Sequence, residues 1–458
     1  MLSESFFERM KNILGDDFAA FSASLDEPPV RAVRVNRIKC ASPEPPFDRI
    51  SLSPLSYAHG GYILNEDIQI GNTPEHHSGM IYVQDPGAMA TVNALDIEQG
   101  WQVADLCAAP GGKSGQLAEK IGNGGFLLSN EYVPKRAKIL VGNLERLGVG
   151  SAMVTSLDTG ELAELFPEFF DLVLADAPCS GEGMLRKYDA ASEEWSEEGV
   201  AACALRQNEI LDNAARMVAP GGYLLYSTCT YSEEENEEQI ASLISRHPEL
   251  KLCEVKDELI AATAPGIYRE GRPKDISKTR RFYPHVSRGE GQYIALLKKD
   301  GEAAARRTPA YRDAAKPLPK EMRAVIEKFF SESLNSTPRG RLALVGDNAV
   351  LIPHSLPVPS RSVFMSGVLI GEIRGKILHP SHQFTSVFGN SFKNRIELSS
   401  EDIKRYIGGE EITLDTDKCG WCAVTYRGAT LGLGKISGSV MKNHYPKGLR
   451  SSSVIIKN

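Results

Sequence analysis

Apolar runs and amphipathic stretches alternate along residues 76–300, and this alternation leaves few folds open to the chain. The apolar runs have the length of buried parallel strands, and the amphipathic stretches have the period of helices that cover a sheet. The alternation predicts an α/β fold with a doubly wound, mostly parallel sheet. The expected strands are 101–106, 125–130, 151–155, 171–176, 221–227 and 292–298. The expected helices are 113–121, 134–147, 201–218 and 233–246.

A chain of 458 residues is too long for a single hydrophobic core, so several domains are expected. The N-terminal part opens with a helical pattern that Gly15 closes. The expected divisions are a small α+β domain at 1–75, the α/β domain at 76–300, an Ala- and Pro-bearing linker at 301–320, and two mixed α/β domains at 321–390 and 391–458. The domain at 321–390 is expected to open with a helix at 321–335.

The cellular setting follows from what the sequence contains. It opens without a basic and apolar leader, and no stretch approaches eighteen apolar residues, so we expect a cytoplasmic protein that does not enter a membrane. Eight cysteines over this length indicate free thiols and not a disulfide framework. We expect a monomer.

The net charge of −7 is unevenly distributed, with −16 in residues 1–300 and +9 in residues 301–458. A basic carboxyl third favours a localised polyanion partner, although a modest excess is also typical of a solvated surface. A second basic stretch lies at 30–39, where four cations alternate with apolar residues: Arg31, Arg34, Arg37 and Lys39. This pattern predicts a strand with one buried face and one exposed cationic face, which contacts either phosphate or solvent.

The strand at 101–106 runs into a glycine turn at the start of a helix. A phosphate-binding P-loop would need a glycine five positions before Gly112, where Cys107 stands, and no dinucleotide fingerprint is present. The Pro110-Gly111-Gly112 turn lets backbone amides approach a ligand, and the helix N-terminus favours a carboxylate. These properties fit the amino-acid moiety of S-adenosylmethionine.

Carboxylates stand at or just beyond the ends of four successive strands: Asp105, Glu131, Asp158 and Asp176. A carboxylate after the second strand of such a sheet holds a ribose diol, which assigns Glu131 to the ribose. Asp158, after the third strand, is expected to contact the adenine. A single carboxylate in this position is more often a helix cap. Four in strand order favour a cofactor edge.

Two cysteines, Cys179 and Cys229, each follow an apolar run and are candidate nucleophiles near one substrate. A thiolate that adds to carbon 6 of cytosine turns the ring into an enamine, whose carbon 5 can accept a methyl group. Asp176, in the same loop as Cys179, is suited to act as an acid at ring nitrogen 3. The alternative is that both cysteines are merely small buried residues.

Three segments together carry a resemblance to a known family: Asp105-Leu-Cys-Ala-Ala-Pro-Gly-Gly-Lys113, Asp176-Ala-Pro-Cys-Ser-Gly-Glu-Gly183 and Tyr226-Ser-Thr-Cys-Thr230. The chain resembles the Nop/Sun family of RNA cytosine-5 methyltransferases, and within it the RsmF type that acts on 16S ribosomal RNA of the small subunit. The resemblance implies a Rossmann-like methyltransferase core with a seven-stranded sheet. It also implies that Cys229 is the nucleophile and that Cys179 assists product release, whereas DNA cytosine methyltransferases use the Pro-Cys thiol.

The expected catalytic residues are therefore Cys229, Cys179 and Asp176. The expected cofactor-binding residues are Cys107, Ala108, Ala109, Pro110, Gly111, Gly112, Lys113, Glu131, Asp158 and Asp176. In the carboxyl third, residues 432–435 and 442–448 resemble the PUA-like RNA-binding module of the RsmF type. This third is expected to supply RNA affinity and not chemistry. An ordinary strand and turn is the alternative there.

Three further features receive structural interpretations. Ser232 and Glu235 have the spacing of a capping box, and the acids that follow complement a helix dipole. Cys419 and Cys422 have a metal or redox spacing without a second ligand pair, so no metal is expected. The adjacent histidines at 76 and 77 are assigned no role.

Two functions from different classes remain open at this point. One is an S-adenosylmethionine-dependent enzyme that makes 5-methylcytosine in ribosomal RNA. The other is an RNA-binding assembly factor with an inactive methyltransferase domain. The presence of both thiols and of all the expected carboxylates favours the enzyme. Transfer RNA is the main alternative substrate, because the chemistry does not depend on which RNA presents the base.

Overall fold

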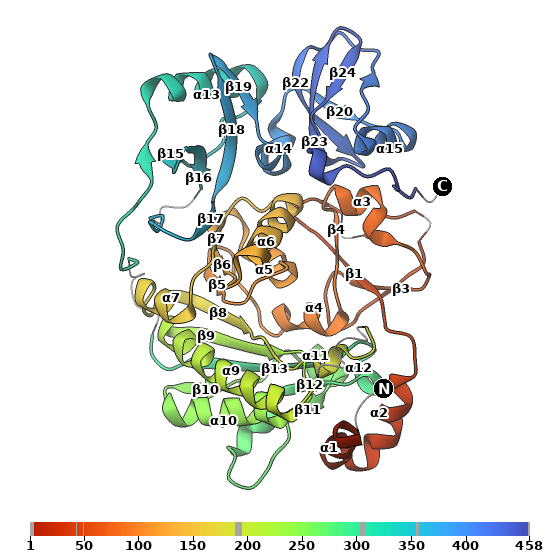
Figure 1. Ribbon diagram of the computed structural model, residues 1–458, viewed down its shortest axis with the longest axis vertical. Coiled ribbons are helices and arrows are strands. Elements are labelled where there is room, and N and C mark those ends of the chain that lie inside the picture. The colour runs from red at the N-terminus through yellow and green to blue at the C-terminus, as the bar shows by residue number, and fades with distance from the viewer. Residues whose placement is uncertain are drawn as a thin grey trace.

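The computed structural model describes residues 4–42, 44–48, 50–187, 195–302, 308–353 and 357–456. They fold into four regions, each built around its own sheet (Figure 1). A four-stranded sheet lies in the N-terminal region, a ten-stranded sheet forms the centre, and two five-stranded sheets follow in the carboxyl third. No helix in these residues is both long and apolar enough to cross a bilayer.

The central sheet has the strand order β11-β12-β13-β9-β8-β5-β6-β7-β17, and β10 pairs with β13. Its middle strands, from β7 to β9, pair in parallel, whereas β13 runs antiparallel to β9. The bounds are β5 (Gln102–Asp105), β6 (Phe126–Asn130), β7 (Ala152–Thr155), β8 (Phe170–Asp176), β9 (Val218–Thr228), β10 (Leu250–Leu252), β11 (Ala264–Pro265), β12 (Arg280–Phe282), β13 (Gln292–Lys299) and β17 (Val363–Ser366). The predicted doubly wound sheet is confirmed, and each expected strand is present.

The sheet is wider than the seven strands that were expected. β7, β6, β5, β8, β9, β13 and β10 make up the core, and β11, β12 and β17 extend its two edges. The added strands have two to four residues, too few for a period to be recognised in the sequence. β17 comes from the carboxyl third and pairs with β7, with Val363 opposite Thr155. The last third of the chain therefore completes the central sheet.

Strand β8 shows why the strand sequences are almost continuously apolar. Val173 and Ala175 face the core that contains Leu211 of one covering helix, whereas Leu172 and Leu174 face the core on the other side of the sheet. All four side chains are fully buried. Burial on both faces removes the apolar-polar alternation of a half-exposed strand.

Helices cover both faces of this sheet (Figure 1). Their bounds are α4 (Pro86–Val92), α5 (Gly112–Ile121), α6 (Pro134–Leu147), α7 (Thr159–Leu165), α9 (Glu197–Met217), α10 (Glu237–Arg246), α11 (Asp257–Ala262) and α12 (Pro284–Ser287). In α6 the buried residues recur every three or four positions, from Ala137 to Leu147. The helix begins at Pro134 and ends at Gly148, whose φ of 78° is left-handed.

The N-terminal region consists of two helices and a sheet in the order β2-β3-β1-β4. The elements are α1 (Glu4–Leu14), α2 (Phe18–Leu25), β1 (Ala32–Val35), β2 (Leu52–Pro54), β3 (Gly61–Leu64), α3 (Pro74–His77) and β4 (Ile81–Val83). The helix predicted before Gly15 is confirmed as α1. Phe6 and Phe21 from the two helices pack against Tyr231 and Tyr283, which follow β9 and β12. The helices thus support the loop after β9.

The predicted exposed cationic face at residues 30–39 is wrong. β1 is an inner strand between β3 and β4, and each of its four residues is buried. Arg34 is 2% exposed and forms an ion pair with Glu119 of α5 at 3.1 Å. The Lys39 ammonium donates to the carbonyl and hydroxyl of Ser386. These two cations of the segment contact residues of other domains. The sequence pattern of a single strand does not distinguish such contacts from exposure to solvent.

The carboxyl third contains the other two sheets, in the orders β14-β15-β16-β18-β19 and β20-β22-β23-β24-β21. The elements are β14 (Lys316–Pro317), α13 (Lys320–Ser333), β15 (Arg341–Val345), β16 (Asn348–Ile352), β18 (Val368–Arg374), β19 (Ile377–Pro380), α14 (His382–Phe388), β20 (Arg395–Glu397), α15 (Ser400–Gly408), β21 (Ile412–Thr413), β22 (Gly420–Tyr426), β23 (Ala429–Ser437) and β24 (Val440–Asn443). The helix expected at 321–335 is α13. Of the expected linker, 303–307 lie outside the described residues, and Tyr311 packs on the central core.

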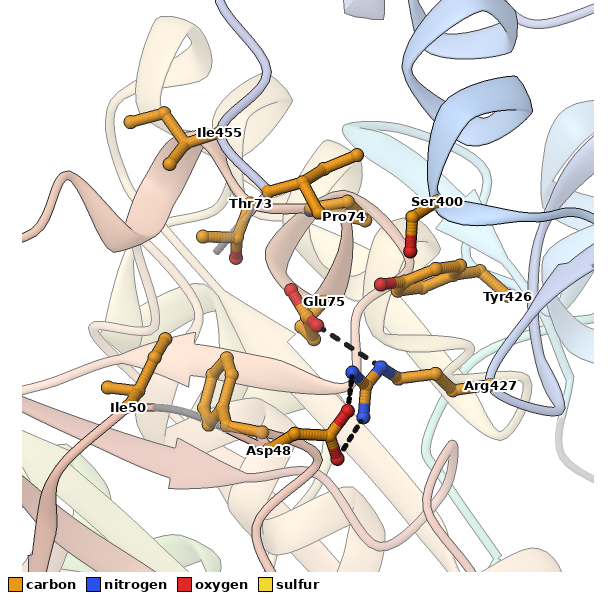
Figure 2. Close-up of a pocket in the computed structure, with 11 residues that line it drawn as sticks. Asp48, Ile50, Thr73, Pro74, Glu75, Ser400, Tyr426, Arg427 and Ile455 are labelled. Carbon is orange, nitrogen blue, oxygen red and sulfur yellow. Dashed lines mark hydrogen bonds and ion pairs between the residues drawn. The ribbon is translucent and has the colours of Figure 1, made fainter. Parts of the chain in front are cut away.

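The last domain rests on the N-terminal region, around a cavity of about 270 Å³ (Figure 2). Arg427, in the turn between β22 and β23, points into this cavity from the last domain. Its guanidinium donates to Asp48 at 3.0 Å and lies 3.4 Å from Glu75. These ion pairs tie the last domain to the loop before β2 and to α3.

A candidate active site at the carboxyl edge of the central sheet

The two candidate thiols meet at the ends of neighbouring strands. β8 and β9 pair in parallel with Asp176 opposite Ser227, so the loops that follow them leave the sheet side by side. The sulfur atoms of Cys179 and Cys229 lie 3.2 Å apart, and the Cys229 amide donates to the Cys179 sulfur at 3.3 Å. Both are free thiols. We call residues 177–187 the Cys179 loop and residues 229–236 the Cys229 loop.

The surroundings of the Cys179 sulfur favour its protonated form. The hydrogen bond to Cys229 raises the pKa of the Cys179 thiol well above its usual value, and burial and the nearby Glu235 carboxylate raise it further. Cys179 therefore holds its proton at neutral pH. A protonated thiol can donate a hydrogen bond to a neighbouring thiolate.

The glycine turn lies beside the thiols, between β5 and α5. Lys113, in the first turn of α5, donates to Asp176 at 2.8 Å, and the Ser227 hydroxyl donates to the other Asp176 oxygen at 2.6 Å. Asp176 thus connects the turn with the strand that leads to Cys229. The glycine turn and the two cysteine loops therefore meet at one edge of the sheet.

The packing of the protein itself requires the glycines of the turn. A Cβ atom on Gly112 would lie 2.9 Å from the Tyr82 ring and 3.3 Å from Gln84, both in or next to β4. A Cβ atom on Gly111 would lie 3.1 Å from Leu140, and its φ of 115° is unfavourable for other residues. Contacts within the protein are therefore enough to exclude larger side chains at both positions, and the approach of a ligand to these backbone amides stays a prediction.

Asp105, at the end of β5, is a buried carboxylate with one free oxygen. The Ser114 hydroxyl donates to its Oδ2 at 2.6 Å, whereas its Oδ1 has no hydrogen-bond partner within the described residues. Burial raises the pKa of Asp105 to about 7. A buried unpaired carboxylate oxygen is costly unless a donor completes it, and the ammonium group of an amino-acid moiety is such a donor.

The other two carboxylates lie further along the same edge. Glu131, just after β6, is 4% exposed, accepts from the Val133 amide at 3.0 Å and lies 3.5 Å from the Arg136 guanidinium. Asp158 is exposed and caps α7 by accepting from the Gly160 amide at 2.8 Å. In the sheet order these acids form one row: Asp158, Glu131, Asp105 and Asp176. One oxygen of Asp158 therefore has the helix-capping role that the sequence left open.

The remaining residues assigned to the cofactor form the backbone of the turn. Cys107, Ala108, Ala109 and Pro110 join β5 to Gly111. The Ala108 amide donates to Asn130 at the end of β6, which fixes the turn against the neighbouring strand. Burial raises the pKa of Cys107 far above its usual value, so this third thiol stays protonated and inert.

The predicted capping box at residues 232–235 is wrong. Ser232 makes no capping hydrogen bond, and its hydroxyl donates to Glu182 in the Cys179 loop at 2.7 Å. Glu235 is fully buried and accepts from Ser180, also in the Cys179 loop. These contacts cross about fifty positions of sequence, so local spacing gave no signal of them. Glu182 and Glu235 are the site residues that the sequence analysis missed.

The Cys419 and Cys422 pair does not form a common site. Cys419 is exposed before β22, whereas Cys422 is buried in the core of the last domain. No group of three or more His, Cys, Asp or Glu residues with metal-ligand geometry occurs in the part of the chain that the structure describes. His77, which was given no role, lies 3.2 Å from the Tyr445 hydroxyl, at the contact between the N-terminal and last domains.

Three family models match this chain in succession. Residues 2–86 match the N-terminal domain of 16S rRNA methyltransferase RsmF. Residues 92–298 match 16S rRNA methyltransferase RsmB/F, and residues 393–451 match the methyltransferase RsmF PUA domain. The last match covers the sheet that contains β22, β23 and β24.

Curated relatives resemble the chain over its full length. Ribosomal RNA small subunit methyltransferase F of Vibrio vulnificus strain YJ016 is 31% identical, over 98% of this chain and 97% of the relative. The protein of the same name from Klebsiella pneumoniae strain 342 is 30% identical, over 97% of this chain and 96% of the relative.

Two solved structures match about two thirds of the chain. A methyltransferase homolog protein from Pyrococcus horikoshii has a TM-score of 0.56 and 28% identity, covering 65% of this chain and 95% of that one. NSun6 from Pyrococcus horikoshii with SFG has a TM-score of 0.54 and 20% identity, covering 66% and 99%. At that identity the second match supports the fold alone.

Proposed function

Because this chain belongs to the RsmB/F family of S-adenosylmethionine-dependent 16S rRNA methyltransferases, we propose that it methylates carbon 5 of a cytosine in 16S ribosomal RNA. The proposed reaction proceeds through a covalent bond between Cys229 and carbon 6. The observation that carries this proposal is the 3.2 Å contact between two thiols at adjacent strand ends, beside the glycine turn. A single buried thiol would have no need of such a partner.

The chain's own residues account for the proposed cofactor site. The unpaired Asp105 oxygen would accept from the ammonium group, and Glu131 and Asp158 would contact ribose and adenine. The amides of the turn at 107–112, at the start of α5, would bind the carboxylate. When bound, S-adenosylmethionine supplies an electrophilic methyl group.

Each proposed catalytic residue has a defined task. Cys229 adds as a thiolate to carbon 6, which makes carbon 5 nucleophilic, and a proton from solvent moves through Asp176, beside Lys113, to ring nitrogen 3. After methyl transfer a water molecule takes the carbon 5 proton, ring nitrogen 3 returns its proton through Asp176 to solvent, the bond between Cys229 and carbon 6 breaks, and the thiolate is restored. Cys179 assists this release, because its sulfur contacts the leaving sulfur. The raised pKa of Cys179 makes Cys179 the less suitable nucleophile, because the nucleophilic form of a cysteine is the thiolate.

The PUA domain offers an RNA contact surface. Trp421, Lys435 and Lys442 are cross-strand neighbours on one face of β22, β23 and β24, and His444 packs on the Trp421 ring. The Lys435 ammonium lies 4.9 Å from the centre of that ring. Neither lysine forms an ion pair within the described residues. Unneutralised cations on a rigid sheet are suited to a phosphate backbone.

Bisulfite sequencing of RNA from cells that lack this protein tests the proposed substrate. Loss of one or more 5-methylcytosines in 16S ribosomal RNA, restored by the wild-type gene and not by a Cys229→Ala gene, is the expected result. Loss confined to transfer RNA would replace the proposed substrate. Full restoration by Cys229→Ala would favour the other function class, an inactive assembly factor, for this gene.

A further inference from the structure

We propose that Glu182 and Glu235 are positioning residues that lock the Cys179 loop and the Cys229 loop together. Each carboxylate belongs to one loop and accepts hydrogen bonds from the other. We call this reciprocal arrangement the carboxylate brace. It builds on the proposed function, because the expected effects follow from the roles given to the two thiols.

Glu182 extends from the Cys179 loop and is 2% exposed. Its carboxylate accepts four hydrogen bonds, and three of the donors belong to the Cys229 loop. The donors are the Thr230 hydroxyl at 2.9 Å, the Tyr231 amide at 2.9 Å, the Ser232 hydroxyl at 2.7 Å and the Trp195 indole at 2.8 Å. A buried carboxylate is tolerated only with such donors, so the Cys229 loop has one favoured position relative to Glu182.

Glu235 makes the reverse connection. It lies at the end of the Cys229 loop and is fully buried. Its carboxylate accepts from the amide of Ser180 at 3.0 Å, from the hydroxyl of the same residue and from the Gln207 amide group at 2.8 Å. Ser180 directly follows Cys179, so Glu235 fixes the backbone that carries this thiol.

The two halves of the brace touch each other and enclose the nucleophile. The Ser180 and Thr230 hydroxyls are 2.8 Å apart. Asn236 holds both neighbours of Cys229, because its side chain accepts from Thr228 at 2.6 Å and donates to the Thr230 carbonyl at 3.0 Å. Catalytic groups on loops gain precision from such surrounding hydrogen bonds. The contact between the two sulfur atoms is thus set by the brace.

Replacing each glutamate by glutamine has unequal consequences, because the NH2 group of a glutamine cannot accept a hydrogen bond. Each Glu182 oxygen faces one obligate N–H donor, from Tyr231 at Oε2 and from Trp195 at Oε1. A glutamine NH2 group at position 182 must therefore face another N–H. At position 235 the two obligate N–H donors, the Ser180 amide and the Gln207 side chain, both face Oε2, and Oε1 faces a hydroxyl that can also accept. Glutamine can satisfy this second environment.

The test uses the full-length protein with its RNA and S-adenosylmethionine, and a denaturing gel that reports covalent RNA. In a Cys179→Ala background, which should retain the adduct, Glu182→Gln should slow adduct formation by about 10- to 100-fold. Glu235→Ala alone should accumulate adduct, as Cys179→Ala does, because Cys179 is misplaced. Glu235→Gln should recover most of the turnover that Glu235→Ala loses. A general loss of folding would not produce a gain of trapped adduct.

The matched control is Glu238→Gln, since Glu238 lies in α10 just beyond the Cys229 loop and pairs with Arg272 at the surface. It should behave as wild type in the gel and in thermal melting. An unchanged rate of adduct formation with Glu182→Gln, or normal turnover without adduct for Glu235→Ala, would overturn the brace. If Glu182→Gln does not fold, Thr230→Val, which removes one donor to Glu182, should also slow adduct formation, by a smaller factor.

A second readout separates the brace from the proposed function. Alkylation of Cys229 by iodoacetamide, followed by mass spectrometry without RNA, reports the position and proton-binding of that thiol directly. Glu182→Gln should change this rate severalfold, and an unchanged rate would contradict the brace. If Cys179→Ala formed no adduct while the alkylation rate still changed, the brace would stand and the assigned thiol roles would be wrong.

Discussion

At the scale of single residues, the site combines carboxylates that are held in three different ways. Asp176 accepts from Lys113 and Ser227, Glu182 accepts from the neighbouring loop, and Asp105 keeps one buried oxygen without a partner. The first two are complete without a ligand. Asp105 is not, and it is therefore the residue whose protonation should respond most to cofactor binding.

Cofactor affinity should depend on pH through Asp105. Its carboxyl has a pKa of about 7 because of burial, so the ionised form that binds an ammonium group is lost as the pH falls below 7. S-adenosylmethionine affinity measured by calorimetry should drop roughly tenfold between pH 7.5 and pH 6. Asp105→Asn should bind weakly with a flat profile. A wild-type affinity that does not change over this interval would remove Asp105 from the cofactor site.

The effect of the Asp105 carboxyl on protein stability changes with pH in the opposite direction to its effect on cofactor affinity. A carboxyl whose pKa is raised by folding stabilises the protein fully below its unfolded pKa of about 3.9, and this contribution is lost as the pH rises through the folded value. The melting temperature of Asp105→Asn relative to wild type should therefore increase from pH 5 to pH 8. A constant difference in melting temperature over this range would mean that burial does not raise the pKa of Asp105.

At the scale of elements, the regular pattern could be predicted from the sequence, and contacts between elements could not. The core strands and α6 followed from apolar spacing, because burial on one or both faces leaves a periodic trace. The cations around Arg34 and the acids at 232–235 also showed regular spacing. Their partners lie on other elements, such as Glu119 and Glu182, so their roles were misread. Local sequence does not encode a partner fifty positions away.

The ladder of cations in the PUA domain, Lys435 and Lys442, is an element with a measurable role. Removing both lysines should weaken RNA binding and reduce the magnitude of the slope of log affinity against log salt by about 2, one unit for each phosphate that is no longer neutralised. Cofactor affinity should not change, because both residues lie outside the central sheet. Lys404→Ala with Lys418→Ala, two exposed lysines of the same domain, is the matched control. An equal loss of RNA affinity in that control would show that general charge, and not this ladder, binds RNA.

At the scale of the whole molecule, the carboxyl third is part of the folding unit as well as an RNA-binding attachment. β17 completes the central sheet beside β7. Val350, Ile352 and Val358 are buried in the same core as the helices behind β8. The last domain also reaches back to the N-terminal region through Arg427. Catalytic and RNA-binding parts should therefore move as one body.

Truncation after residue 305 should consequently destabilise the methyltransferase core. Burying a Val or Ile side chain contributes about 1.5–3 kcal/mol, and the cut removes three of them and exposes the edge of β7. Thermal melting followed by circular dichroism should show a lower and less cooperative transition than in the full chain. An unchanged melting temperature would show that the core folds independently and that the shared sheet is incidental.

The covalent RNA adduct is the most direct test of the roles assigned to the two thiols. After incubation with RNA and S-adenosylmethionine, a denaturing gel should show a slow band for Cys179→Ala, because this variant adds to carbon 6 and transfers methyl but cannot release the product. Cys229→Ala and the double variant should show no band. A slow band for Cys229→Ala and none for Cys179→Ala would make Cys179 the nucleophile and contradict the mechanism.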